Sequence, residues 1–182
     1  MELLDVVDEN NELTGKISDR DTIHKEGLWH REISVIIINQ NKELLIQRRA
    51  ATKKIGANMW SVTAGHIDAG EEPIIAAIRE SEEELGFENL KNNDFKLLMI
   101  QKNEGNSSSV KNNHFKYIYL LKTDKDVSDY ILQESEVSEV KYISVSDLQN
   151  IIKDTTNCEK NYTKIFFRDY FQDILEKINN NL

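Results

Sequence analysis

The chain has 182 residues, 30% of them charged, and a formal net charge of −9. That length suits one domain with a sizeable core, and the negative balance argues against an electrostatic grip on long nucleic acid or on an anionic membrane. A single cysteine (Cys158), no bilayer-length apolar run and no signal-peptide pattern at the first residues together favour a cytoplasmic protein without disulfides.

The first thirty residues predict a small hairpin and a short helix. Residues 3–16 alternate loosely about a polar turn at residues 8–11, which is typical of a hairpin. Ser18 followed by Asp21 predicts the start of a helix that stops near Gly27. We treat residues 1–30 as an N-terminal extension, whose hairpin would suit a homodimer contact.

The middle of the chain predicts a sheet. Residues 35–38 are apolar on both faces of their strand, which favours a central position. A polar loop is expected at residues 103–113, Ser146 is expected to cap a helix through residue 152, and residues 161–178 read as an aromatic amphipathic helix. The segments predicted as strands are 32–39, 43–48, 60–64, 94–102, 114–122 and 137–145. The pattern predicts an α/β fold with a central mixed β-sheet between helices.

Residues 65–87 carry the most informative pattern, and a helix is predicted inside it. Pro73 suits a first helical turn, where its missing N–H costs nothing, and Gly86 suits a left-handed stop. At about 100° per residue, one stripe of that helix is apolar and the roughly opposite side is acidic. The apolar stripe consists of Ile74, Ile78 and Leu85.

The acidic side of this helix holds Glu80, Glu83 and Glu84. Like charges at i, i+4 destabilise an isolated helix, and such a cluster repels itself unless a divalent cation sits there. Arg79 can bridge to Glu71 or to one of the cluster. An ordinary solvated acidic face is the alternative, since glutamate is a good helix former. The set spacing of glycines and arginine around the cluster favours metal chemistry on a phosphate-containing substrate.

The spacing of these residues resembles the Nudix box of the Nudix hydrolases (MutT-type pyrophosphohydrolases). It reads Gly65, five residues, Glu71, seven residues, then Arg79-Glu80-x-x-Glu83-Glu84-x-Gly86. Every polar and glycine position of that pattern is matched, and the one departure is Ser81, where the family usually has a bulky aliphatic residue. The resemblance implies a Nudix α/β/α sandwich in one domain over 1–182. Its core would span 31–152 with the box at 65–87, and a C-terminal helix would lie within 153–182.

The resemblance also implies a chemistry. Mg²⁺ or Mn²⁺ would be held by Glu80, Glu83 and Glu84 with the Gly65 carbonyl, and Arg79 would position the cluster. Water would then attack a pyrophosphate bond in a nucleoside diphosphate linked to another moiety. Some members of the family use the glutamate that matches Glu80 as general base. The sequence does not indicate which derivative is cleaved.

Residues outside the box would complete such a site. Others in the family use a glutamate from a later loop as the base, and the candidates in this chain are Glu104, Glu134 and Glu136. Basic residues at the end of a predicted strand would orient the phosphates, namely Arg48, Arg49 and Lys53. For each of these residues a solvated surface position is the alternative.

Two other functions remain as alternatives. The pattern around His24, His30 and Gly65-His66 resembles isopentenyl-diphosphate isomerase of the same superfamily, which holds a metal with three histidines and two glutamates and needs a cysteine before its Gly-His pair. Here Ala64 replaces that cysteine, and Asn112 and His114 stand where the glutamates would align. The histidines would then be structural or marks of a hydrolase subgroup. A non-catalytic nucleotide-binding module is the second alternative, although such modules usually lose box glutamates.

Overall fold

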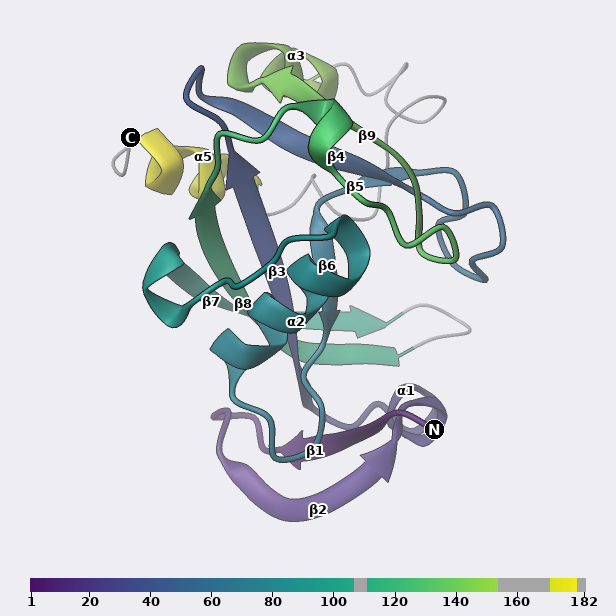
Figure 1. Ribbon diagram of the computed structural model, residues 1–182. Coiled ribbons are helices and arrows are strands. Elements are labelled where there is room, and N and C mark those ends of the chain that lie inside the picture. The colour runs from purple at the N-terminus through teal and green to yellow at the C-terminus, as the bar shows by residue number, and fades with distance from the viewer. Residues whose placement is uncertain (107–110, 154–170, 180–182) are drawn as a thin grey trace.

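The computed structural model describes residues 1–106, 111–153 and 171–179 (Figure 1). Its elements are β1 (Leu3–Val7), β2 (Leu13–Asp19), α1 (Arg20–Glu26), β3 (His30–Ile38), β4 (Glu43–Arg49), β5 (Trp60–Ser61), β6 (Thr63–His66), α2 (Pro73–Leu85), η1 (Asn92–Asp94), β7 (Phe95–Asn106), β8 (Lys111–Lys122), η2 (Val127–Asp129), β9 (Val137–Ser144), α3 (Val145–Lys153) and α5 (Phe171–Asn179). None of the helices in these ranges is long and apolar enough to cross a membrane.

A seven-stranded mixed sheet is the centre of the fold. Its main path runs β5-β4-β3-β8-β7, with β6 paired to β3 and β9 paired to β4. Strand β3 is parallel to β8 and antiparallel to β4 and β6, so it is surrounded by partners, and its residues 33–38 are all buried. The prediction of a central, doubly buried strand is confirmed.

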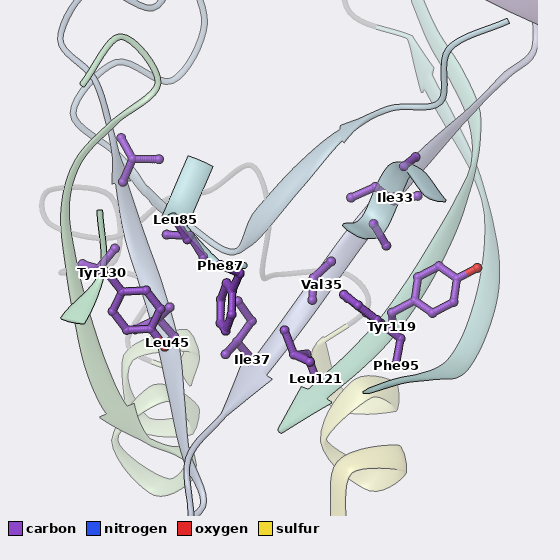
Figure 2. Close-up of a cluster of buried hydrophobic side chains, with 14 of the residues drawn as sticks. Ile33, Val35, Ile37, Leu45, Leu85, Phe87, Phe95, Tyr119, Leu121 and Tyr130 are labelled. Carbon is purple, nitrogen blue, oxygen red and sulfur yellow. The ribbon is translucent and has the colours of Figure 1, made fainter. Parts of the chain in front are cut away.

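The two faces of the sheet are covered by different helices. Residues Ile36 and Ile38 of β3 belong to a cluster that includes Leu148 of α3 and Ile174 of α5. The alternate residues of β3 face the other side, where they pack with α2 and with aromatic side chains from connecting segments and from β7 and β8 (Figure 2). The labelled residues of that second cluster are Ile33, Val35, Ile37, Leu45, Leu85, Phe87, Phe95, Tyr119, Leu121 and Tyr130. The helices on both faces confirm the predicted α/β/α layering.

The N-terminal extension packs against the start of the box segment. Strands β1 and β2 form a separate two-stranded sheet, and with α1 they enclose a small core of Leu4, Val6 and Ile23. The backbone N–H of Ala69 donates to the Leu3 carbonyl at 2.8 Å, and Leu4 forms an isolated bridge with Asp68. Figure 1 shows β1, β2 and α1 together at one end of the central sheet.

Three local predictions are corrected by the structure. Helix α1 is capped by Asp19 rather than Ser18, because the Asp19 carboxylate accepts a hydrogen bond from the Thr22 N–H at 2.9 Å. Helix α3 is preceded by Ser144, whose hydroxyl accepts from the Asp147 N–H at 3.0 Å, so Ser146 is not the capping residue. The segment predicted as strand 60–64 is divided into β5 and β6.

The prediction of a polar loop at 103–113 is wrong for its described residues, 103–106 and 111–113, which lie in β7 and β8. Its described residues continue the β7–β8 ladder, with Asn103 opposite His114, Glu104 opposite Asn113 and Gly105 opposite Asn112. Extending the ladder satisfies the backbone polar groups, and polar side chains are tolerated because this end of the hairpin lies beyond the apolar core. Of the predicted C-terminal helix, 171–178 is described as helical, while 161–170 and Cys158 lie outside the described residues.

Candidate functional site

Helix α2 carries the acidic residues, and its ends are set by local sequence. Pro73 stands in its first turn, and Gly86 ends it with a φ of 66°, a conformation that glycine adopts without strain. The helix buries Ala76, Ala77 and Leu85 against the sheet. Ser81 is also buried, and its hydroxyl donates to the Ala77 carbonyl at 2.8 Å, so the departure from the family pattern leaves no unsatisfied polar atom there.

Arg79 is the centre of a network that orders the box segment. Its Nε and Nη2 donate to the two carboxylate oxygens of Glu71, each at 2.9 Å, which is a bidentate pair. Its Nη1 lies 2.7 Å from Glu80 Oε1 and 3.5 Å from Glu83 Oε2, and its Nη2 also donates to the His66 carbonyl at 3.1 Å. The Glu71 and Glu80 carboxylates raise the pKa of Arg79, with Glu71 the largest cause. The guanidinium therefore fixes the loop, the helix and the end of β6 relative to one another.

Gly65 lets the backbone of β6 approach the acidic helix. It pairs with Ile33 of β3, and a Cβ atom built on it would lie 2.2 Å from Glu80 Oε1 and 2.3 Å from Glu80 Cδ. Real side chains do not tolerate such contacts, so only glycine fits between β6 and Glu80 in this arrangement. The approach brings the backbone next to the carboxylate oxygens.

Glu84 is the most deeply buried of the three clustered glutamates. It is 5% exposed, and its Oε2 accepts a hydrogen bond from Gln47 Nε2 at 2.7 Å. Thr63 Oγ1 in turn donates to Gln47 Oε1 at 2.9 Å, which fixes the orientation of the Gln47 amide. Burial raises the pKa of Glu84 to about 8, with a smaller contribution from the Glu80 charge.

The other two carboxylates of the cluster lie in different surroundings. Burial raises the pKa of Glu80, whereas the Arg79 charge acts in the opposite direction. The Glu83 side chain is 51% exposed and so opens to solvent.

These residues fit a hard divalent cation. Carboxylates and backbone carbonyls are the ligands that Mg²⁺ and Mn²⁺ prefer. Gly65 brings main-chain atoms close to Glu80, and burial raises the pKa values of Glu80 and Glu84, so their charged forms lack the solvation that water would give them. A bound cation would compensate for that loss.

The basic residues predicted to bind phosphate are engaged with neighbouring groups. Arg48 contacts the Asn58 carbonyl and lies 3.5 Å from Glu139, and Lys53 lies 2.5 Å from Glu136. Arg49 donates to the Ile55 carbonyl, and its charge also lowers the pKa of Glu84 against the larger effect of burial. The role of these three residues in binding phosphate stays a prediction.

The candidate loop bases lie in two places. Glu136 raises the pKa of Glu84 by its charge, and its loop contacts the end of α2, where the Gln133 N–H donates to the Glu84 carbonyl at 3.1 Å. Glu134 is exposed in the same loop. Glu104 lies in β7 opposite Asn113, so its prediction as a loop residue is wrong.

The three histidines of the isomerase-like pattern come together in the structure. Their ring centroids are 5.2–5.4 Å apart. Sequence reasoning missed Glu32, which lies among them, and Gln47, which holds Glu84. Each is a polar side chain next to the apolar part of its strand. Burial lowers the pKa of His24 and of His114 to about 4.

Comparisons with known proteins agree with this fold and site. The NUDIX domain family profile matches residues 28–164. The chain is 33% identical to Nudix hydrolase 3 of Arabidopsis thaliana over 83% of its own length, but it spans only 20% of that plant protein. It is 31% identical to an uncharacterized Nudix hydrolase of Clostridium acetobutylicum, covering 83% of this chain and 74% of the relative.

Isomerases are also among the relatives. The chain is 30% identical to isopentenyl-diphosphate Delta-isomerase 2 of Photorhabdus laumondii, over 96% of each chain. Among solved structures, the Deinococcus radiodurans protein DR0079 superposes with a TM-score of 0.69 at 20% identity, covering 97% of this chain and 98% of that one. The family profile, the hydrolase relatives and the shared fold lead to one conclusion: the chain belongs to the Nudix hydrolase family.

Proposed function

We propose that this protein is a divalent-metal-dependent hydrolase that cleaves a pyrophosphate bond in a nucleoside diphosphate linked to another moiety. The observation that carries the proposal is the position of the box residues: Glu80, Glu83 and Glu84 all lie on α2, and Gly65 packs against Glu80. The relatives of the chain include proteins named as Nudix hydrolases.

The residues of the site would have separate roles in binding the metal and in positioning its ligands. Glu80, Glu83, Glu84 and the Gly65 carbonyl would hold Mg²⁺ or Mn²⁺, which when bound withdraws charge from phosphorus and makes a water molecule more acidic. Arg79 holds Glu80 and Glu71 in place, and Gln47 holds Glu84 through its side-chain amide.

Proton removal from the attacking water is assigned to Glu80. Its carboxylate is largely buried among the other acidic groups, and burial raises its pKa towards the range where a general base works well. The nearest loop candidate, Glu136, is already held by Lys53 at 2.5 Å. A substrate phosphate that drew Lys53 away would free Glu136, so the two assignments are separated by mutating each carboxylate.

The isomerase alternative has one observation in its favour, namely the similarity to the Photorhabdus isomerase over nearly the whole chain. Against it, Ala64 on β6 replaces the cysteine that the resemblance requires, and Asn112 and His114 replace the two glutamates. Protonation of an alkene needs an acid at that place. Hydrolysis of an anhydride needs the acidic helix, which is intact.

The test is a substrate panel with Mg²⁺, in which released phosphate is measured after a coupled phosphatase. ADP-ribose and diadenosine tetraphosphate belong in the panel, because solved structures with this fold are described as a complex with ADP ribose and as an Ap4A hydrolase. Glu83→Gln should abolish turnover, and Glu72→Gln is the matched control, since Glu72 makes no side-chain cap bond on the same helix.

The outcomes separate the three functions. Metal-dependent turnover that is lost in Glu83→Gln and kept in Glu72→Gln supports hydrolysis. Isomerisation of isopentenyl diphosphate without anhydride cleavage would support the isomerase reading. Saturable nucleotide binding without any turnover would support a binding module. Hydrolysis that survives both Glu83→Gln and Glu84→Gln would defeat the proposal.

A further inference from the structure

A second group of metal-ligand side chains lies where the N-terminal extension meets the sheet. It consists of His24 on α1, His30 and Glu32 on β3, and His66 on β6, and we call it the histidine cluster. One ligand atom from each of the four residues lies within 4.8 Å of all the others. These residues come from three elements, and β6 is more than thirty residues away from the other ligands in sequence, so the fold itself assembles the cluster.

The histidine rings are oriented as metal ligands usually are. His30 Nδ1 lies 3.2 Å from the Leu28 carbonyl, and His66 Nδ1 lies 2.9 Å from Glu2 Oε1. Such contacts place the proton on Nδ1 and leave the Nε2 lone pair for a cation. In both residues the atom left over is the one that faces the rest of the cluster.

The Nε2 atoms of the three histidines accept or donate no hydrogen bond within the described part of the chain. Those of His24, His30 and His66 are all buried without a hydrogen-bond partner there, and His30 as a whole is 0% exposed. Buried polar atoms are rarely left unpaired, because each one costs free energy. Three such atoms converging on one point indicate a missing common partner, and a cation would satisfy all three.

Glu32 supplies the fourth ligand atom. Its Oε1 lies 3.6 Å from His30 Nε2 and 3.7 Å from His66 Nε2. Ligand atoms around a tetrahedral zinc ion, with bonds of about 2.0–2.1 Å, are separated by about 3.3–3.4 Å. The carboxylate is steadied on its other side, where Oε2 lies 3.1 Å from Lys116 Nζ and 3.5 Å from His114 Nε2.

We propose that His24, His30, His66 and Glu32 form a binding site for a zinc-class transition-metal ion, which fastens the N-terminal extension to the strand that precedes the acidic helix. Three imidazoles and one carboxylate suit Zn²⁺ or Co²⁺, whereas Mg²⁺ prefers the all-oxygen set of the box. The ligand set is particular to this chain, because Glu32 provides the carboxylate and Asn112 and His114 occupy the positions of the isomerase glutamates.

The site would act on the active centre through β6. The side chain of His66 belongs to the histidine cluster, while its backbone carbonyl accepts a hydrogen bond from Arg79. Its neighbour Gly65 packs against Glu80. An ion held between α1, β3 and β6 would therefore fix the position of the strand from which the box begins.

The experiment uses the full chain without a polyhistidine tag, stripped with a chelator and titrated with Co²⁺ and then Zn²⁺. Bound metal is measured by elemental analysis, the ligand geometry by the visible absorption of Co²⁺, and stability by thermal unfolding. We expect one tightly bound equivalent, a four-coordinate Co²⁺ spectrum, and a Tm increase of about 5–10 °C at a hundredfold excess of Zn²⁺ over its Kd.

Variants assign the ion to its site. His24→Gln should weaken Co²⁺ and Zn²⁺ binding by more than about 100-fold, since it removes a direct ligand. His66→Gln is the second variant, in case the first does not fold. Glu83→Gln is the control for the acidic helix and should leave the tight equivalent unchanged.

Each result decides the question. Loss of the tight equivalent in the histidine variants, with retention in Glu83→Gln, supports the site. No tight uptake by the native chain, or full uptake by a folded His24→Gln protein, would overturn it. Uptake lost only in Glu83→Gln would place the ion in the box and also overturn this proposal, while leaving the hydrolase assignment untouched.

Discussion

Glu84 offers the sharpest test of how the acidic helix works. The side chain is 5% exposed, and burial raises its pKa from 4.5 to about 8. Without a cation, folding must therefore either take up a proton at Glu84 or bury its charge. Replacement by glutamine keeps the shape and can still accept the hydrogen bond from Gln47, but removes that cost. We expect Glu84→Gln to be more stable than the native protein in the presence of a chelator.

The size of the effect follows from the shift. For a carboxyl whose folded-state pKa is raised, stability is lost as the pH rises from the unfolded value towards the folded one, here from 4.5 to about 8. The corresponding cost is about 1 kcal/mol at pH 5, about 3 kcal/mol at pH 7 and about 5 kcal/mol at pH 9. Glutamine does not titrate, so the variant should gain these amounts, or about 6–12 °C in Tm at pH 7.

Thermal unfolding at several pH values, with EDTA or with Mg²⁺, measures this directly. In EDTA the advantage of the variant should grow from pH 5 to pH 8 and then level off. With Mg²⁺ the native protein should gain stability and the variant should not, since it lacks one carboxylate ligand. Glu83→Gln, at a position 51% exposed, should change stability in EDTA by less than about 0.5 kcal/mol. A variant that is less stable in EDTA at pH 8, or a pH-independent difference, would refute the reasoning.

Three further substitutions test the geometry of the box. Gly65→Ala would place a Cβ 2.2 Å from Glu80, so we expect a loss of about 1–3 kcal/mol in unfolding free energy and at least tenfold lower turnover; native-like values for both would contradict the close approach. Arg79→Lys cannot keep the bidentate pair with Glu71, and we expect more than tenfold lower kcat with the fold retained by circular dichroism; unchanged kcat would argue against a positioning role. Gln47→Leu removes the amide donor from the buried carboxylate and the acceptor of the Thr63 hydroxyl. We expect about 1–3 kcal/mol lower stability in EDTA at pH 9, measured by urea unfolding, and a smaller loss at pH 5, where Glu84 is uncharged; an equal loss at both pH values would contradict the role of Gln47 towards the charged carboxylate.

The fold was predictable where the sequence has a strong period or a fixed spacing. Helix α2 spans Pro73–Leu85, because proline favours a first helical turn and Gly86 favours a left-handed end. Strand β3 is central because its apolar residues alternate between two cores. The predicted secondary structure was wrong where polar residues give no hydrophobic period and backbone pairing alone decides between strand and loop. The β7–β8 hairpin runs through Gly105 because its ladder continues beyond the core, and no side-chain pattern signals that.

The site was predictable only in part, because its contacts join residues distant in sequence. The spacing of Arg79 and Glu71 favoured their bridge, and the structure has it. The roles of Gln47 and Glu32 were not predicted, because the partner that explains each of them comes from another element. A polar residue at an inward-facing strand position was the available signal in both cases.

Strand β6 is only four residues long, yet two neighbouring positions on it belong to different chemical neighbourhoods. Gly65 abuts Glu80, and the His66 ring meets His24 of α1. Exchanging the first thirty residues for those of a homologue would thus also alter the surroundings of the proposed active site. A donor segment without a histidine at position 24 would leave His30 Nε2 and His66 Nε2 buried beside a side chain that cannot share a ligand with them. The residue at position 24 should therefore be chosen together with those at 30, 32 and 66.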